Sequence, residues 1–311
     1  MRGRDMVGPR VEIPPKFAAF ADRSADWAAW LDALPRLVAD VMDDWALRYD
    51  GSPAHGECAV VIPVTTPEGE PAVVKYGWPH EEAEFEHLAL REWRGNGAVR
   101  LLRADPRRFA LLLERAHTRD LTTLPVLDAC EEVAGLYGRL HVSAPPQLQR
   151  LSDLCGDWSG RLLALPTGAP VPRRYVEQAS SLAADFASDA DTDGRLIHTD
   201  LHFENVLAAD REPWLAIDPK PLSGDPHYEV APLLWNRWDE IIESGDVRRS
   251  VRERLHSTID AASLDEDRAR DWAVVRVMVN AMWELEEPSP PSDEKANWLA
   301  EAVLIAKAVQ D

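Results

Sequence analysis

Only three cysteines occur in this chain of 311 residues, and no two of them form a CxxC pair. Cys58, Cys130 and Cys155 therefore indicate reduced thiols rather than a disulfide framework or a zinc site. Basic residues are also scarce, with 34 lysines and arginines against 54 aspartates and glutamates. The resulting net charge of −20 repels the phosphate backbone of nucleic acids, so no nucleic-acid partner is expected.

Long apolar runs are absent as well. No stretch approaches the roughly 18 residues that a membrane-spanning helix needs. The first residues include arginines but lack the apolar core of a signal peptide, so we expect a cytoplasmic protein with no membrane partner. Because 45% of the residues are hydrophobic, the chain can still bury a core large enough for two lobes or one large domain.

The first third of the chain mixes helical and strand patterns. Apolar residues recur near the 3.6-residue period over residues 27–45, which predicts a helix ahead of the first strand. Residues 58–76 and 99–116 each contain two β-rich runs separated by a turn, and the acidic stretch 79–93 between them favours a helix. The predicted order is helix, two strands, helix, two strands.

Beyond Glu114 strand patterns become rare and helical patterns dominate. Helices are expected over residues 126–141, 175–187, 228–244, 247–262, 266–285 and 294–309. The exception is one short hairpin, in which NVLAA and WLAID are joined by an Asp-Arg-Glu-Pro turn. We therefore expect two domains, residues 1–114 and residues 115–311, the second one mainly helical.

The hairpin carries the clearest chemical pattern. Asp200 is followed five residues later by Asn205, and Asp218 ends the second strand. This spacing is typical of phosphoryl-transfer sites, in which the first aspartate accepts the proton of the attacking hydroxyl and the other two residues hold Mg²⁺. Carboxylate and amide oxygens are the hard ligands that Mg²⁺ prefers. A capped turn is the simpler explanation for Asp200 and Asn205 alone, but it does not explain the ordered set with Asp218 and Lys75.

Two histidines flank Asp200. His198 and His202 lie four residues apart, a spacing that zinc ligands also use. The glutamate of an HExxH motif is absent and the segment is not helical, so structural roles are expected.

At these residues the chain resembles the aminoglycoside phosphotransferase family, nearest its streptomycin 6-phosphotransferase and hydroxyurea phosphotransferase branch. Two segments carry the resemblance, HTDLHFENVLAADREPWLAIDPKPLSGDP and GNGAVRLL, and the layout covers nearly the whole chain. The resemblance implies an α+β, protein-kinase-like fold of two lobes, a small antiparallel-sheet N-lobe and a larger, mainly helical C-lobe. It also implies that Asp200 is the catalytic base, that Asn205 and Asp218 bind Mg²⁺, and that ATP is the donor.

The first lobe supplies a partner for the phosphates. Lys75, which ends the strand PAVVK, can reach the α- and β-phosphates if a helix glutamate orients it. Glu82 and Glu86 lie one turn apart on the same helical face, and the resemblance of FEHLALREW to the family's helix favours Glu86, with Glu82 as the alternative.

Two further nucleotide contacts follow from position. The segment DGSPAHGECAVV, which contains Gly56, occupies the place of the phosphate-covering loop, although it lacks GxGxxG. The resemblance puts the adenine against the backbone around Glu114 and Ala116. Glu229 departs from the family pattern, because relatives usually have aspartate at this position. The departure leaves open how the loop that would bind the metal is supported.

The acceptor is expected to be a small molecule. Only about ten residues separate Asp218 from the next helix, too few for the activation segment of a regulated protein kinase. Acidic residues beside Trp283 suit a cationic acceptor, with a solvated helix end as the alternative. Streptomycin or a related aminoglycoside is favoured, and no obligate protein partner is implied. Acceptor contacts are assigned by position alone to Trp235, Asp239, Asn280, Trp283 and Glu284.

Two alternatives remain at this stage. The same scaffold can serve a kinase of hydroxyurea or of a metabolite intermediate, and net charge does not distinguish these acceptors. A non-catalytic, kinase-like binding module is the other alternative. Retention of Asp200, Asn205, Asp218 and Lys75 argues against it, because loss of such residues marks that kind of decay.

Overall fold

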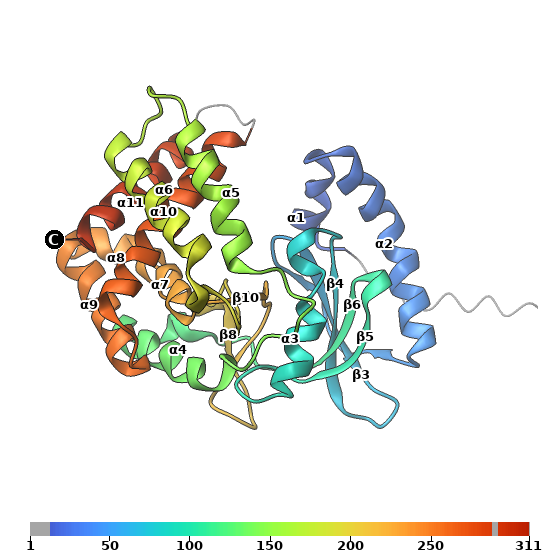
Figure 1. The fold of residues 1–311 in the computed structure, drawn as a ribbon. Coiled ribbons are helices and arrows are strands. Elements are labelled where there is room, and N and C mark those ends of the chain that lie inside the picture. The colour runs from blue at the N-terminus through green and yellow to red at the C-terminus, as the bar shows by residue number, and fades with distance from the viewer. Residues whose placement is uncertain (1–12, 288–291, 311) are drawn as a thin grey trace, which may run out of the picture. The chain divides into compact units, whose positions relative to one another are not determined.

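The first helices and strands of the chain build one unit, and most of the remaining helices build another (Figure 1). The structure is a computed structural model that describes residues 13–287 and 292–310. The first unit contains the described residues up to Gly95 together with Val99–Ala116. The second contains Asn96–Ala98 and the described residues from His117 onward. In the described ranges, no helix is both long and apolar enough to cross a membrane.

A long amphipathic helix opens the first unit, as expected. Helix α2 (Ala25–Asp44) follows α1 (Pro15–Ala18), and the side chain of Ser24 caps it by accepting the N–H of Trp27. Its apolar face is buried in the same core as one face of the sheet. The buried members from α2 are Trp27, Leu31, Leu34, Val38, Val41 and Met42.

The two expected strand pairs join into one antiparallel sheet, because β4 pairs with both β3 and β6. The strand order is β1–β3–β4–β6–β5, and β2 also pairs with β3. The expected helix between the pairs is shorter than predicted, because an exposed 3-10 turn (Glu81–Ala83) precedes α3 (Glu86–Trp93). The strands are β1 (Arg48–Tyr49), β2 (Ala54–His55), β3 (Ala59–Thr65), β4 (Pro71–Gly77), β5 (Leu101–Asp105) and β6 (Ala110–Glu114).

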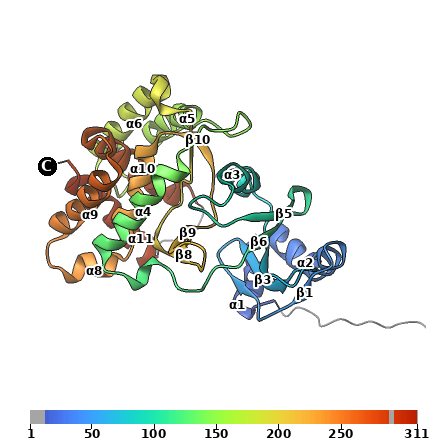
Figure 2. The ribbon, with the colours of Figure 1, turned by 90° about the horizontal axis from the view of Figure 1, so that it is seen from below.

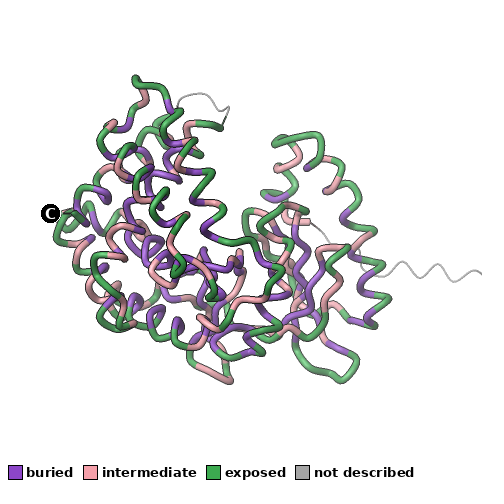
Figure 3. The backbone as a smooth tube through the Cα atoms, in the orientation of Figure 1, coloured by how far each residue is buried: buried purple, intermediate pink, exposed green. Residues whose placement is uncertain are grey.

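Helices dominate the second unit, and their buried faces form one large core (Figure 3). One of them was not expected from the sequence. Helix α5 contains Gly156 and Gly160, which disfavour helix, but packing of its buried side chains against α6 outweighs that preference. The helices are α4 (Val126–Leu140), α5 (Leu151–Ala164), α6 (Arg173–Ser188), α7 (Ala231–Trp235), α8 (Trp238–Glu243), α9 (Val247–Ala262), α10 (Glu266–Glu286) and α11 (Asp293–Ala308).

The single helix predicted over residues 228–244 was wrong. The segment is a 3-10 turn (Pro226–Val230) followed by α7 and α8, with Arg237 between them in a left-handed conformation, φ +52°. The buried guanidinium of Arg254 donates to the carbonyls of Leu233, Asn236 and Arg237. These bonds hold the backbone carbonyls at the break between α7 and α8.

Two small sheets lie among these helices (Figure 2). The predicted hairpin is β8 (Val206–Ala208) paired with β9 (Trp214–Ala216). A second pair, β7 (Arg195–Ile197) with β10 (Leu222–Gly224), was not predicted. Gly224 fits closely here, because an added Cβ would lie 2.3 Å from Cδ1 of Ile197 and would force that side chain to shift.

Candidate active site

The loop after β7 begins with a strained residue. Thr199 has φ +64°, a conformation that a β-branched side chain rarely adopts. Its N–H donates to Oε1 of Glu229 and its Oγ1 donates to the carbonyl of Lys220 at 2.7 Å. The guanidinium of Arg276 donates to the carbonyl of Thr199 at 2.8 Å. These three bonds fix the backbone from which Asp200 follows.

Glu229 anchors this loop from a fully buried position. Besides the N–H of Thr199, its carboxylate accepts a hydrogen bond from Nε2 of His141 at 2.7 Å. Burial by itself raises the pKa of Glu229, but the hydrogen bond and charge of His141 outweigh it, so the pKa lies below its ordinary value. The glutamate that departs from the family's aspartate therefore supports the loop as a charged group.

His198 joins the loop of Asp200 to the strand that leads to Asp218. Its Nδ1 accepts the N–H of Asp200 at 3.3 Å, and its Nε2 lies 2.8 Å from the carbonyl of Ile217. Because Nδ1 accepts, Nε2 must carry the proton. Burial lowers the pKa of His198, which keeps the imidazole neutral. The structural role expected for His198 is confirmed.

The hairpin brings Asn205 and Asp218 to the same end of β8 and β9. Asn205 precedes β8, and its carbonyl accepts the N–H of Ile217 at 2.9 Å. Its Nδ2 donates to the carbonyl of Asp200 at 2.8 Å, which turns Oδ1 away from that carbonyl. Asp218 directly follows Ile217 and has φ +56°, the second strained residue of this region.

The donor set at this end of the hairpin suits a hard cation. One amide oxygen and one carboxylate match Mg²⁺, which takes its remaining ligands from phosphates and water. Residues 13–287 and 292–310 contain no group of three or more His, Cys, Asp or Glu side chains that could hold a metal ion. A site of the closed zinc type is therefore not present in these residues.

Lys220 is a residue of this site that the sequence interpretation missed. Its Nζ lies 2.6 Å from Oδ2 of Asp200. His202 lies on the other side, with Nε2 3.9 Å from Oδ1 of Asp200 and Nδ1 2.7 Å from Oε2 of Glu204. Burial alone would lower the pKa of His202, but the hydrogen bond with Glu204 and the charge of Asp200 raise it. His202 thus belongs to the surroundings of Asp200 rather than to the core.

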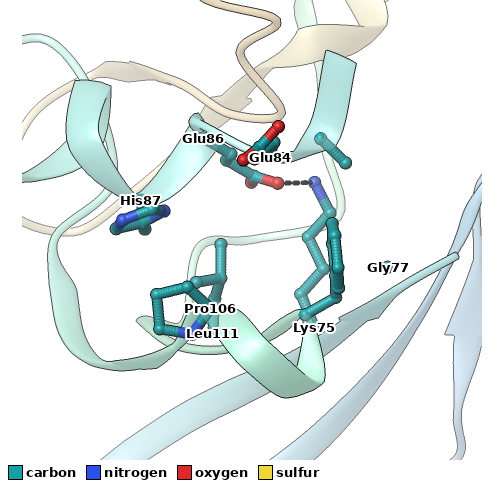
Figure 4. Close-up of a pocket in the computed structure, with 9 residues that line it drawn as sticks. Lys75, Gly77, Glu84, Glu86, His87, Pro106 and Leu111 are labelled. Atoms are coloured by element: carbon teal, nitrogen blue, oxygen red, sulfur yellow. Dashed lines mark hydrogen bonds and ion pairs between the residues drawn. The ribbon is translucent and has the colours of Figure 1, made fainter. Parts of the chain in front are cut away.

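In the first unit, Lys75 is paired with Glu86 (Figure 4). Nζ of Lys75 in β4 lies 2.6 Å from Oε2 of Glu86, the first residue of α3, and both side chains are almost completely buried. Glu82 lies in the 3-10 turn before α3 and is exposed. A small cavity of about 20 Å³, also lined by His87 and Leu111, borders the pair. The pairing therefore favours Glu86 over Glu82 as the residue that orients Lys75.

The loop containing Gly56 is tied to the N-terminal helices. Arg23 donates to the carbonyl of Glu57 at 3.2 Å and to its Oε2 at 2.8 Å, while its guanidinium lies 3.5 Å from the ring centre of Phe20. Gly56 itself donates its N–H to the carbonyl of Ala59 at 3.0 Å, and a Cβ there would meet nothing within 4 Å. Gly56 thus faces open space, and Arg23 holds the next residue of the loop, Glu57.

The residues expected at the adenine lie at the end of the first unit. Glu114 is the last residue of β6, and its N–H donates to the carbonyl of Arg100 at 3.0 Å. Ala116 is the final residue assigned to this unit.

The residues assigned to the acceptor by position fall on two parts of the second unit. Trp235 ends α7 and packs edge-on against Trp298 of α11, and Asp239 lies in α8. Asn280, Trp283 and Glu284 lie in α10. The acid groups at the end of α10 have cationic partners, since Lys295 lies 3.7 Å from Glu284 and Arg161 pairs with Glu286.

Comparison with known proteins gives consistent matches along the chain. The family model for aminoglycoside/hydroxyurea antibiotic resistance kinases matches residues 44–287. A streptomycin 6-kinase of Streptomyces glaucescens is 41% identical over 303 residues, 94% of this chain and 97% of that protein. A hydroxyurea phosphotransferase of Kitasatospora aureofaciens is 38% identical over 310 residues, 96% of this chain and 87% of that protein.

Among solved structures, the chain is similar to an aminoglycoside phosphotransferase in a ternary complex with ADP and hygromycin B. The TM-score is 0.58 at 17% identity, over 88% of this chain and 98% of that one. The expected α+β, protein-kinase-like fold is thereby confirmed.

Proposed function

Because the chain belongs to the aminoglycoside/hydroxyurea antibiotic resistance kinase family, we propose that it phosphorylates an aminoglycoside hydroxyl, with streptomycin as the favoured acceptor. The chain is an ATP-dependent small-molecule kinase. The observation that carries the proposal is the His198 bridge, which holds the loop of Asp200 against the strand leading to Asp218. We also propose residues 1–114 as the nucleotide-binding domain and residues 115–311 as the catalytic and acceptor domain, acting in the cytoplasm.

Asp200 is the proposed base. It would orient the acceptor hydroxyl and take its proton while the hydroxyl oxygen attacks the γ-phosphorus of ATP. Bound Mg²⁺ would neutralise phosphate charge, and Asn205 and Asp218 are the residues that would hold it. The rigid loop described above supports this role, because phosphoryl transfer depends mainly on positioning and electrostatic stabilisation.

Other residues are assigned to the nucleotide. Lys75, oriented by Glu86, would contact the α- and β-phosphates, and backbone around Gly56 would cover them. Backbone groups of Glu114 and Ala116 would receive the adenine. The buried pair of Lys75 and Glu86 supports the first assignment, because an isolated lysine would not remain charged at that depth.

Carboxylates of the second unit favour a cationic acceptor. The hydrogen bond with His202 lowers the pKa of Glu204 to about 2, so this carboxylate is ionised. Asn236 Nδ2 donates to Glu204 at 3.0 Å, and Trp235, one of the proposed contacts, is its neighbour in the chain. Burial, together with the charge of Asp239, raises the pKa of Glu301. These acidic groups and tryptophans are the partners that guanidinium or ammonium groups select.

The same proposal includes three residues of α10 as acceptor contacts. Asn280, Trp283 and Glu284 would contact a distant portion of a large acceptor. We assign them no role in the transfer itself.

Hydroxyurea is the second candidate acceptor. The relative named hydroxyurea phosphotransferase matches 96% of this chain, nearly the same share as the streptomycin 6-kinase. Hydroxyurea is small and uncharged, so it would not use the acidic groups around Asp239.

The decisive experiment is a transfer assay over a panel of acceptors. The purified chain, with ATP and Mg²⁺, is incubated with streptomycin, other aminoglycosides or hydroxyurea, and ADP release is followed. We expect release with streptomycin, and mass spectrometry then locates the phosphate. Transfer to hydroxyurea alone would replace the proposal with the second candidate, and a folded, ATP-binding protein that phosphorylates none of them would refute both.

Two variants test the base within that assay. Asp200→Asn should retain ATP binding while turnover collapses. Asp210→Asn is the matched control, because the Asp210 side chain is 94% exposed and pairs only with His117 among the contacts described. Near-normal turnover of Asp200→Asn would remove Asp200 from its role.

A further inference from the structure

Resting on the proposed function, we propose that Lys220 is a second phosphate-contacting lysine, which binds the transferring phosphoryl group beside Asp200. Nζ of Lys220 lies 2.6 Å from Oδ2 of Asp200. The two side chains are 33% and 25% exposed, so a substrate can reach the pair. Lys220 is not part of the pattern formed by Asp200, Asn205 and Asp218, and the fold does not by itself assign it a role.

The position of Lys220 is built into the loop. Its N–H donates to the carbonyl of His198 at 3.0 Å, and its carbonyl accepts from Oγ1 of Thr199 at 2.7 Å. Pro219 and Pro221 restrict the backbone on both sides. The lysine is therefore fastened to the two residues that immediately precede Asp200, and base and ammonium group keep a fixed relation.

Stability does not explain a lysine at this place. A partly exposed ion pair contributes roughly 0–1 kcal/mol, which an uncharged hydrogen-bonding residue could replace. The ammonium group also occupies one oxygen of the carboxylate that is to accept the proton, which is a cost for proton transfer. A gain at another stage of the reaction is needed to offset that cost.

The chemistry of transfer provides that gain. The acceptor oxygen must be within hydrogen-bond distance of Asp200 and in line with the γ-phosphorus. The phosphoryl oxygens then lie next to the carboxylate, and an ammonium group on that carboxylate is within reach of them. Negative charge spread over these oxygens in the transition state attracts the cation more strongly than the ground state does.

The step balances without consuming Lys220. The acceptor O–H proton passes to Asp200 as the new O–P bond forms, and the bond between the γ-phosphorus and the bridging oxygen breaks. ADP leaves with that electron pair. Lys220 remains protonated and only moves its hydrogen bond from Asp200 to a phosphoryl oxygen.

Kinetics of Lys220→Met and Lys220→Arg test this role. We expect Lys220→Met to lower kcat by about 100-fold or more, as loss of a transition-state donor does, while KM for the acceptor changes little. Lys220→Arg should recover part of the loss, because it keeps the charge. Lys307→Met, at an exposed position of α11, is the matched control. A Lys220→Met kcat within about threefold of the parent protein would overturn the proposal.

Calorimetry supplies a readout that does not depend on turnover. Binding of ADP is measured with Mg²⁺, with and without tetrafluoroaluminate, which mimics the transferring phosphoryl group. Lys220→Met should bind ADP with unchanged affinity, but it should lose the increase in ADP affinity that tetrafluoroaluminate gives the parent protein. If Lys220→Met keeps the full increase in ADP affinity, Lys220 positions Asp200 and does not contact the phosphoryl group. If the parent protein phosphorylates no acceptor, the proposed function fails, and this binding comparison still decides the role of Lys220.

Discussion

Glu229 holds the N–H of Thr199 through one carboxylate oxygen and Nε2 of His141 through the other. Both oxygens of a fully buried carboxylate are thus used to keep the residue before Asp200 in a strained conformation. The residues involved are far apart in the chain, which makes the catalytic loop dependent on the packing of α4 against the segment before α7.

Replacing Glu229 by glutamine should weaken both fold and activity. The amide keeps an acceptor for Thr199 but removes the charge from a buried hydrogen bond, and we expect a loss of about 2 kcal/mol in the free energy of unfolding. Turnover should fall as the loop relaxes. Urea denaturation checks the first effect, with Glu177→Gln as the control, since Glu177 is 57% exposed and pairs with Arg173 on its own helix. Equal stability of the two variants would contradict the anchoring role.

His198 should make stability depend on pH. An imidazole has a pKa near 6.5 when free, and burial lowers the pKa of His198 in the folded chain. Below about pH 6.5 the unfolded chain therefore binds a proton that the folded chain does not, so this contribution to stability is lost as the pH falls toward the folded pKa.

His198→Asn should flatten this slope, whatever its effect at neutral pH. Unfolding free energies measured from pH 8 to about pH 5 give the comparison. His256→Asn is the control, because His256 on α9 has a side chain that is 43% exposed and pairs with Glu266. An unchanged slope in His198→Asn would mean that another group causes the acid sensitivity.

Residues whose placement depends on local spacing could be predicted from the sequence. The distance of five residues from Asp200 to Asn205 follows from one short loop, and Asp218 follows from one hairpin. Lys75 alone would be a solvated strand end, and it was singled out because it completes the ordered set with Asp200, Asn205 and Asp218. These features need only secondary structure, which the apolar patterns indicate well.

Residues whose role depends on distant packing could not be predicted. Glu229 lies 88 positions from His141, and nothing in either segment indicates their pairing. Lys220 lies 20 positions from Asp200, and nothing in the spacing of the two residues indicates their pairing. Helix α5 was missed for the same reason, because its stability comes from contact with α6 rather than from its own glycine-containing sequence.

Lys75→Met should impair nucleotide binding. Removing a charged hydrogen bond to phosphate costs about 1.5–3 kcal/mol, which corresponds to a loss of roughly 10- to 150-fold in kcat/KM for ATP. Glu86→Gln removes the charge that lies 2.6 Å from Nζ of Lys75 and orients it, so this variant should lower kcat/KM in the same direction. Lys16→Met, on the exposed side of α1, is the control. Normal ATP kinetics in Lys75→Met would exclude Lys75 from the phosphate site.

Arg23→Ala should affect ATP through the loop of Gly56 rather than through the fold. Arg23 is 40% exposed and its partner Glu57 is 83% exposed, so their ion pair adds less than about 1 kcal/mol to stability. Its second bond, to the carbonyl of Glu57, restrains the backbone directly after Gly56. Without it the loop must be ordered when ATP binds, and we expect KM for ATP to rise several-fold, about 3- to 10-fold, at unchanged acceptor KM. Arg36→Ala is the matched control, since Arg36 is 90% exposed and pairs with Asp40 on its own helix. If both variants show the same ATP kinetics, the N-terminal helices serve the core of the first unit and do not position the loop.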